Sequence, residues 1–166
     1  TIVIAPRFGS NNGRACKDAL RANEVNWTCG GHNAWRVGSP AADNEALTSY
    51  DFADEILRKL ARKDVFPKLK QIVVAGHSAG GQFVSRYVMA NQVHDTLRVR
   101  ITYVVASPSS YAYVDPSRPA RGGAQFGAFA NTSTCPTYDQ WPYGLIGRSG
   151  SLSDRKSTRL KSSHIT

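Results

Sequence analysis

Short apolar runs rich in β-branched residues alternate with longer segments of helical periodicity along the chain. Three runs have the continuous apolar character of strands buried on both faces of a sheet: Thr1–Ala5, Gln71–Ala75 and Val99–Ala106. Pro6 ends the first run, and no further strong strand pattern follows Ala106. We therefore expect about three strands.

Two segments between these runs predict amphipathic helices. The first begins at Thr48, where Asp51 three residues later completes a capping-box pattern, and Pro67 follows its end. Its acidic residues lie near the front and its basic residues near the end, an order that stabilises a helix through its dipole. The apolar positions of the first helix are Phe52, Ala53, Ile56, Leu57 and Leu60, and those of the second are Phe83, Val84, Tyr87 and Val88.

The order strand, helix, strand, helix, strand predicts βαβ units, and therefore an α/β fold with a parallel sheet. The 166 residues suffice for one domain, and the chain has no internal repeats. Residues Arg7–Leu47 are irregular and rich in Gly. A loop of that length inside a compact domain is usually functional or locally structured.

One motif at the end of the run Gln71–Ala75 carries chemistry. Gly76-His77-Ser78-Ala79-Gly80 fits the pattern G-x-S-x-G, in which a sharp strand-to-helix turn lifts the central side chain above the sheet edge. We expect the outer positions to require glycine because the strand and helix backbones nearly touch there. The hydroxyl of Ser78 would stand at a helix N-terminus, with the Ala79 backbone N–H directed at a developing oxyanion.

The surroundings of this motif favour a nucleophile. An apolar strand pattern precedes it and an amphipathic helix pattern follows it, as the G-x-S-x-G turn requires. A phosphate-binding loop is the competing use of such a turn, but G-x-G-x-x-G is absent and so is the Lys of a P-loop. A Gly-rich turn with an idle Ser78 stays open as the structural alternative.

Residues Gln71–Asn91 (QIVVAGHSAGGQFVSRYVMAN) resemble the fifth strand, nucleophile elbow and following helix of α/β-hydrolases. Thr1–Phe8 is similar to the preceding strand, and Val99–Ala106 is similar to the sixth. The segments APRF, GHSAGGQFVSRY and ASPSSYAY resemble a group of poorly characterised, often secreted members of that superfamily. The resemblance implies part of a three-layer α/β-hydrolase sheet, with about three strands and flanking helices, over residues 1–153.

The resemblance also assigns roles to the residues of the motif. It implies that Ser78 is the nucleophile and that Ala79 supplies a main-chain oxyanion donor. His77 fills the variable elbow position, whose side chain normally points away from the serine, so it is not thereby the base. The second oxyanion donor of the family follows the third strand, which would lie before Thr1.

The family's triad follows the order Ser, acid, His. Among the histidines after Ser78, His94 falls on the wrong edge of the sheet for a base, and His164 lies in the terminal segment. His32 lies upstream and would break the order. We therefore expect that the base lies outside this chain and that the chain as given is inactive.

Two carboxylates are candidates for the acid. Asp115 follows the last strand pattern, a position that some members of the family use, and Asp139 comes later; a surface role is the alternative for both. Aromatic residues follow the strand ends, the side on which open α/β sheets bind ligands, and either line a substrate pocket or pack the loops. They are Trp27, Trp35, Tyr111, Tyr113, Trp141 and Tyr143.

The cysteines and two short motifs favour a secreted protein. Cys16 and Cys29 lie in a polar loop that a disulfide would stabilise, and we expect them to pair. No strong zinc pattern is present, so we expect no metal and no cofactor. Asn26-Trp27-Thr28 and Asn131-Thr132-Ser133 fit the pattern of N-glycosylation acceptors.

The net charge of +9 would suggest an anionic partner, but part of it belongs to the last residues. Asp154–Thr166 (DRKSTRLKSSHIT) holds four basic residues against one acidic residue and resembles the translation of a sequencing adapter. We expect a disordered and artefactual tail there, with a natural basic tail as the alternative. The chain also starts at Thr1, inside an apolar run, as if cut at its front, and no apolar run is long enough to span a membrane.

These patterns together predict a serine hydrolase that transfers an acyl group to water through an acyl-serine intermediate. Esters, either small molecules or polymers, are the expected substrates, with amides and thioesters open. A non-catalytic hydrolase-like binding domain is the first alternative. A basic nucleic-acid-binding domain ranks last, because the Lys and Arg residues show neither clustering nor a known motif.

Overall fold

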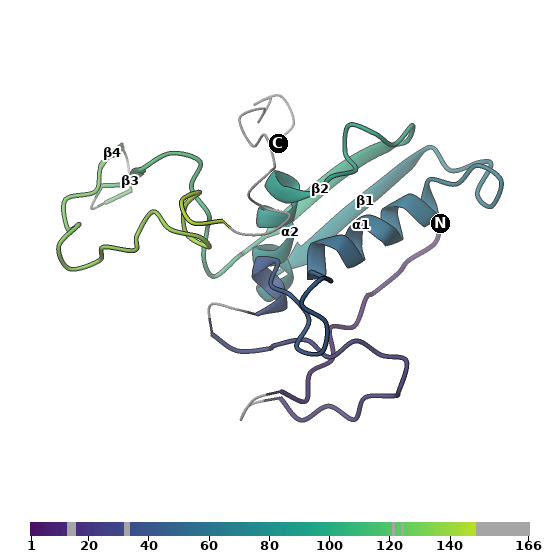
Figure 1. Cartoon of the computed structure of the whole chain (residues 1–166). Coiled ribbons are helices and arrows are strands. Elements are labelled where there is room, and N and C mark those ends of the chain that lie inside the picture. The colour runs from purple at the N-terminus through teal and green to yellow at the C-terminus, as the bar shows by residue number, and fades with distance from the viewer. Residues whose placement is uncertain (13–15, 32–33, 121, 124, 149–166) are drawn as a thin grey trace.

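The computed structural model describes residues 1–12, 16–31, 34–120, 122–123 and 125–148. The expected tail, residues 154–166, and the histidines His32 and His164 lie outside the described residues. The described elements, in chain order, are η1 (Trp35–Val37), α1 (Ser49–Leu60), β1 (Gln71–His77), α2 (Ala79–Ala90), β2 (Arg100–Ala106), β3 (Ser117–Pro119) and β4 (Phe126–Ala128). Figure 1 shows β1 and β2 side by side near both helices. Strands β3 and β4 belong to the segment 107–148, which we call the arm and which extends away from them.

Strands β1 and β2 form a parallel pair connected by α2. Their register runs from Gln71 opposite Arg100 to His77 opposite Ala106. Both strands lie where the apolar runs predicted them, and the βαβ order confirms an α/β arrangement for this part of the chain.

Helix α1 begins as its sequence predicts. Thr48 is the N-cap: its hydroxyl oxygen accepts the backbone N–H of Asp51 at 3.1 Å, and the Asp51 carboxylate accepts the backbone N–H of Thr48 at 3.0 Å. This capping box satisfies two N–H groups that the first helical turn leaves without acceptors.

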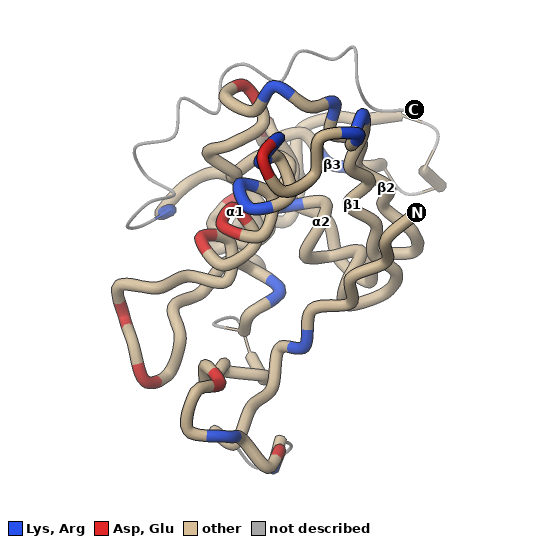
Figure 2. The backbone as a smooth tube through the Cα atoms, turned by 90° about the vertical axis from the view of Figure 1, so that its right-hand side faces the viewer, with Lys and Arg blue, Asp and Glu red and all other residues tan. Residues whose placement is uncertain are grey.

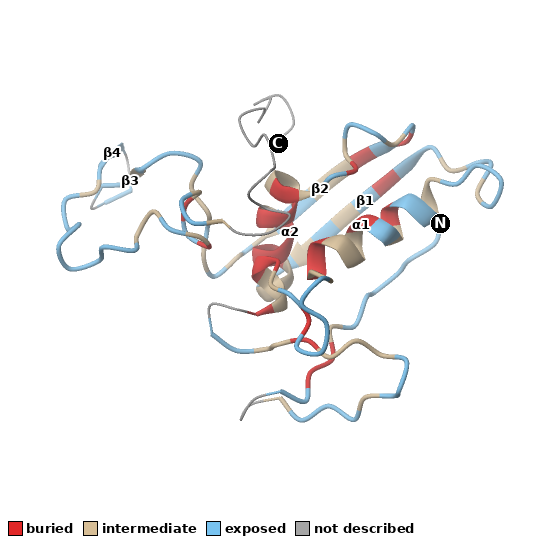
Figure 3. Cartoon of the chain, in the orientation of Figure 1, coloured by how far each residue is buried: buried red, intermediate tan, exposed pale blue. Residues whose placement is uncertain are grey.

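Both helices share one apolar core with one face of the β1–β2 pair. The core joins Tyr50 and Leu57 of α1 to the α2 side chains and to the strand residues Ile72 and Ile101. On the other face of the pair, Val73 is 55% exposed. We expected three layers, with helices on both faces of the sheet. The described residues form two, because α1 and α2 both pack on the same face of the β1–β2 pair (Figure 3).

The first strand prediction is wrong, and one short strand pair was not predicted. Thr1–Ala5 is not a strand: it pairs with no described strand, and the side chains of Ile2 and Val3 are exposed. Its β-branched residues favour extended backbone, but a strand also needs a hydrogen-bonding partner. The short antiparallel pair β3–β4 was not expected, because three-residue strands are too short to show an alternating pattern.

The long segment before α1 is packed by aromatic rings and closed by a disulfide. Phe8 stacks on Trp35 with ring centroids 4.6 Å apart, and Trp27 is buried. The predicted disulfide Cys16–Cys29 is confirmed, with Cα atoms 6.4 Å apart. This segment is locally structured although it contains almost no regular elements.

Candidate active site at the strand–helix turn

Ser78 occupies a strained turn between β1 and α2. Its backbone has φ 54° and ψ −115°, a conformation that non-glycine residues rarely adopt, and its side chain is exposed. Its N–H donates to the Ala106 carbonyl at 3.1 Å, which ties the turn to the end of β2. The predicted strain and position are confirmed: Ser78 alone separates a parallel strand from a helix, and the residue is exposed.

The glycines around Ser78 divide into two classes. A Cβ at Gly76 would lie 2.2 Å from the Gly80 carbonyl oxygen, so only glycine fits there. A Cβ at Gly80, in contrast, would meet no described atom within 4 Å. The expectation that both require glycine is therefore right for Gly76 and wrong for Gly80. The second required glycine is Gly81, whose added Cβ would lie 2.5 Å from the Ala106 carbonyl oxygen.

The helix start beside Ser78 offers backbone N–H groups to a developing negative charge. Ala79 is the first residue of α2, so its N–H is one of the four that an α-helix leaves without an intrahelical acceptor. The partial positive charge of the helix N-terminus acts at the same place. Ala79 is half-buried, and the Gln82 N–H donates to the Ser78 carbonyl at 2.9 Å, which fixes the first turn.

Two polar side chains of α2, which the sequence patterns did not single out, hold the loop that follows β2. Gln82 bonds the hydroxyls of Ser109 and Ser110, accepting from Ser110 at 3.1 Å. Arg86 is fully buried and donates to the Ser110 hydroxyl at 2.9 Å and to the Pro142 carbonyl at 3.0 Å. The i, i+4 spacing of two polar residues beside apolar helix positions is the signal that could have identified them.

Arg86 carries its charge in a buried position. Its desolvation lowers the pKa of the guanidinium below the ordinary value. The side chain nevertheless has several hydrogen-bond acceptors around it, which include the carbonyls of Gln82 and Ser110. Arg86 is thus a buried cation held by backbone and hydroxyl oxygens, and it joins α2 to two later segments.

His94 lies far from Ser78. Its ring centroid is 5.7 Å from that of Tyr103, which pairs with Val74 in the middle of the sheet. Val74 is four residues before Ser78, so the two positions differ by about 13 Å along the strand. His94 also follows the C-terminal end of α2, whereas Ser78 precedes its start. The structure does not bring His94 to Ser78.

The two candidate acids are held by other groups. The Asp115 carboxylate is exposed and accepts the backbone N–H of Ser117 at 2.7 Å, and this bond is the main reason that the pKa of Asp115 is lowered. Asp139 forms an ion pair with Arg118 at 3.0 Å, with both side chains largely buried. The described contacts place neither carboxylate beside His94 or Ser78.

Several aromatic candidates for a substrate pocket pack the loops instead. Trp27 and Trp35 belong to the packed segment before α1, and the Trp141 ring N–H donates to the Val37 carbonyl at 3.0 Å. The Arg118 guanidinium lies 4.2 Å from the centre of the Tyr113 ring. Tyr111 remains 53% exposed.

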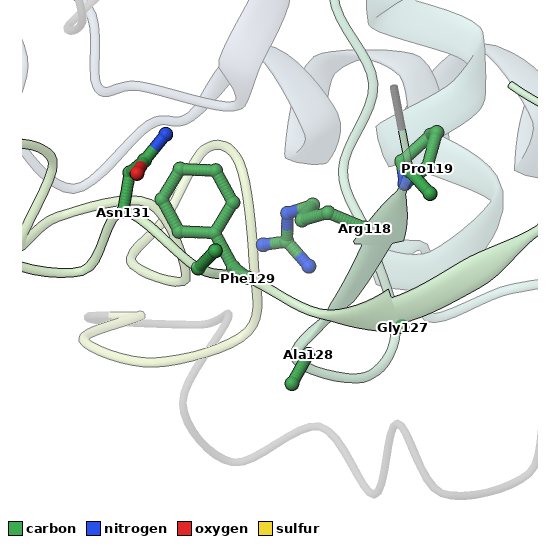
Figure 4. A pocket seen from close by; sticks show the side chains of 8 residues that line it. Arg118, Pro119, Gly127, Ala128, Phe129 and Asn131 are labelled. Carbon is green, nitrogen blue, oxygen red and sulfur yellow. The ribbon is translucent and has the colours of Figure 1, made fainter. Parts of the chain in front are cut away.

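A shallow hollow lies away from the serine. Its volume is about 320 Å³, and Figure 4 shows Arg118, Phe129 and Asn131 around it. It is formed on the β3–β4 arm and contains no residue of the turn at Ser78. The lining residues are Arg118, Pro119, Ala120, Gly127, Ala128, Phe129, Ala130 and Asn131.

Charge and metal-ligand patterns add no second site within the described residues. Lys and Arg are spread over several segments and interspersed with Asp and Glu (Figure 2). In this part of the chain, no group of three or more His, Cys, Asp or Glu could hold a metal ion. None of the described helices is long and apolar enough to cross a membrane.

Compared with protein-family models, with curated proteins and with solved structures, the chain matches none of them. The turn at Ser78 is therefore characterised by its own geometry. That geometry is a strained, exposed serine between a parallel strand and a helix, with two sterically required glycines beside it.

Proposed function

We propose that the protein is a serine hydrolase of the α/β-hydrolase type, in which Ser78 attacks an ester carbonyl. The observation that carries the proposal is the backbone of Ser78, φ 54° and ψ −115°, at the junction of β1 and α2. Strain of this kind at the residue between a strand and a helix is typical of nucleophile elbows. Among the described non-glycine residues, Ser107 also has a positive φ, 43°, but it follows β2 and does not precede a helix. The close approach of Gly76 to the Gly80 backbone supports the same interpretation.

In the proposed reaction, the Ser78 oxygen forms a bond to the acyl carbon and gives its proton to a base. The backbone N–H of Ala79 donates to the oxyanion, and the alcohol leaves with a proton from the same base. Water then attacks the acyl-serine, which releases the acid and restores the serine hydroxyl. Small-molecule or polymeric esters are the proposed substrates.

A serine hydroxyl is a poor nucleophile at neutral pH without a base. The described residues bring no histidine to Ser78 other than its neighbour His77, since His94 lies at the opposite end of α2. The proposal therefore assigns the base, and the remaining layers of a hydrolase sheet, to parts of the protein beyond those described. The same placement of His94 favours the second candidate, a hydrolase-like binding domain that does not catalyse.

We also propose that the protein is secreted. The disulfide Cys16–Cys29 supports this, because disulfides persist mainly in oxidising compartments.

An ester-hydrolysis assay separates the two candidate functions. The proteins to compare are this chain, the complete gene product, and the complete product with Ser78→Ala or Ser85→Ala. Ser85 is the matched control, because it lies on the same helix and its hydroxyl donates only within α2, to the Gln82 carbonyl. We expect hydrolysis by the complete product and by its Ser85→Ala variant alone. Hydrolysis that survives Ser78→Ala would overturn the proposal, and no hydrolysis by any of them would favour the binding domain.

A further inference from the structure

The chain contains two N-glycosylation acceptor patterns, and the sequence alone does not indicate which of them would carry a glycan. They are Asn26-Trp27-Thr28 and Asn131-Thr132-Ser133. A glycan is bulky and hydrated, so the folded protein accommodates it only where the acceptor amide faces solvent. The structure places the two asparagines in very different surroundings.

Asn26 forms hydrogen bonds with two other segments of the loop, at Asn11 and at Ala42–Asp43. Its side-chain oxygen accepts the Asn11 N–H at 3.1 Å, and its side-chain nitrogen donates to the Asn11 side-chain oxygen at 2.5 Å. Its backbone N–H donates to Asp43 at 3.3 Å, and its carbonyl accepts from Ala42 at 2.8 Å. The nitrogen that would carry a sugar is therefore engaged in the bonds that shape the loop.

The neighbours of Asn26 are packed as well. Trp27 is 2% exposed, and its ring centroid lies 5.7 Å from that of Phe8. The Thr28 carbonyl accepts from Trp35 at 3.0 Å, and Cys29 closes the disulfide. The whole acceptor pattern is thus part of the folded loop.

Asn131 lies in an exposed turn. Asn131, Thr132 and Ser133 are all exposed. The hydrogen bonds that shape the turn use the Asn131 backbone carbonyl, which accepts the N–H groups of Thr134 at 3.2 Å and Cys135 at 3.0 Å. Within the part of the chain that the structure describes, no hydrogen bond uses its side-chain amide. Figure 4 shows this amide at the edge of the hollow beside Phe129.

We propose that Asn131 is the N-glycan acceptor of the folded protein and that Asn26 is not. The inference rests on the proposed secretion. In the transfer, the side-chain nitrogen of Asn131 bonds to the anomeric carbon of a lipid-linked oligosaccharide pyrophosphate and gives up one of its two protons. The bond between that carbon and the pyrophosphate breaks, and the lipid pyrophosphate leaves.

The test is expression of this chain behind a cleavable secretion signal in a eukaryotic host, followed by digestion with a peptide N-glycosidase. Asn131→Gln and Ser133→Ala each remove one pattern, and Asn26→Gln and Thr28→Ala remove the other. Thr28→Ala is included because it keeps the Asn26–Asn11 bonds, whereas Asn26→Gln can prevent folding by itself. The added signal makes the result independent of the hydrolase proposal and of the natural route of secretion.

We expect the secreted protein to lose one glycan on digestion. The Thr28→Ala protein should lose the same glycan, and both the Asn131→Gln and Ser133→Ala proteins should show no shift. Mass spectrometry should place the glycosidase-generated aspartate at position 131. A glycan found at Asn26, or secreted protein without any glycan, would overturn the inference.

Discussion

The segment Thr48–Ala106, which we call the body, and the arm, Ser107–Arg148, are held in different ways. The body has the helices α1 and α2, the parallel strands β1 and β2, and the apolar core that these elements share. In its described residues, the arm has two three-residue strands and mostly exposed side chains (Figures 1 and 3). The body combines a strand ladder with apolar burial, whereas the arm is held by the short β3–β4 ladder, by backbone hydrogen bonds within its turns and by two cationic side chains.

Two arginines show how the arm is held. Arg86, from the body, donates to the Ser110 hydroxyl and the Pro142 carbonyl. Arg118, within the arm, pairs with Asp139 and donates to the Tyr138 carbonyl at 2.8 Å. A segment with so few buried apolar contacts opens more easily than the core does. The turn at Ser78 belongs to the body, whereas the candidate acids Asp115 and Asp139 belong to the arm.

The largest expected effect is at the elbow of the body. Gly76→Ala forces a Cβ against the Gly80 carbonyl and should destabilise the chain by about 3 kcal/mol, as overpacking does. Gly80→Ala is the matched control: its Cβ meets no described atom, and Ala favours a helix over Gly by up to about 1 kcal/mol. Urea denaturation measures both. Equal destabilisation by the two variants would contradict the close packing at Gly76.

Arg86→Met should increase local opening of the arm more than that of the body. It leaves the buried Pro142 carbonyl without its donor, and an unsatisfied group of that kind costs about 1–3 kcal/mol. Hydrogen exchange should accelerate for arm amides such as that of Tyr143, with little change in α2. Arg98→Met, at an exposed position, should change hydrogen exchange neither in the arm nor in α2. Uniform acceleration across both regions would show that the arm does not open separately.

The capping box at Thr48 should contribute to the stability of the body and not to that of the arm. Thr48→Ala removes the side-chain acceptor for the Asp51 N–H and should reduce stability by about 1 kcal/mol. Thr48→Ser, which keeps a hydroxyl, should lose much less. The denaturation midpoint reports the difference, and a midpoint unchanged in Thr48→Ala would contradict the role of the cap.

The smallest effect concerns Asp115 in the arm. Its pKa is lowered because the ionised carboxylate accepts the Ser117 N–H, so this contact stabilises the arm above the unfolded pKa of Asp. The stabilisation should disappear as the pH falls through the lowered folded pKa. Carboxyl NMR titration should show Asp115 below its ordinary value of 3.8. A raised pKa would instead indicate that Asp115 is buried or close to another acid.

The sequence predicted the body well, because its signals are local. The capping pattern at Thr48, the apolar runs of β1 and β2, and the elbow at Ser78 each depend on residues close in the chain. The steric need for Gly81 was missed because its neighbour is the Ala106 carbonyl, on another strand.

Other features escaped prediction because they depend on tertiary contacts. Asp54 is one of the acidic residues near the front of α1, but it is buried, and its carboxylate accepts a hydrogen bond from the Tyr87 hydroxyl of α2 at 2.6 Å. Arg86 acts on Pro142, 56 residues away. The segment Thr1–Ala5 has the composition of a strand, but it pairs with no strand among the described residues.

The central claim, that Ser78 is a nucleophile, is tested most directly by trapping its covalent adduct. The complete gene product is treated with a fluorophosphonate ester, digested, and mapped by mass spectrometry. We expect a single phosphonylated serine at position 78, with no adduct in the Ser78→Ala protein and an unchanged adduct in the Ser85→Ala protein. An adduct on another serine, or an active esterase that carries none at Ser78, would contradict the claim.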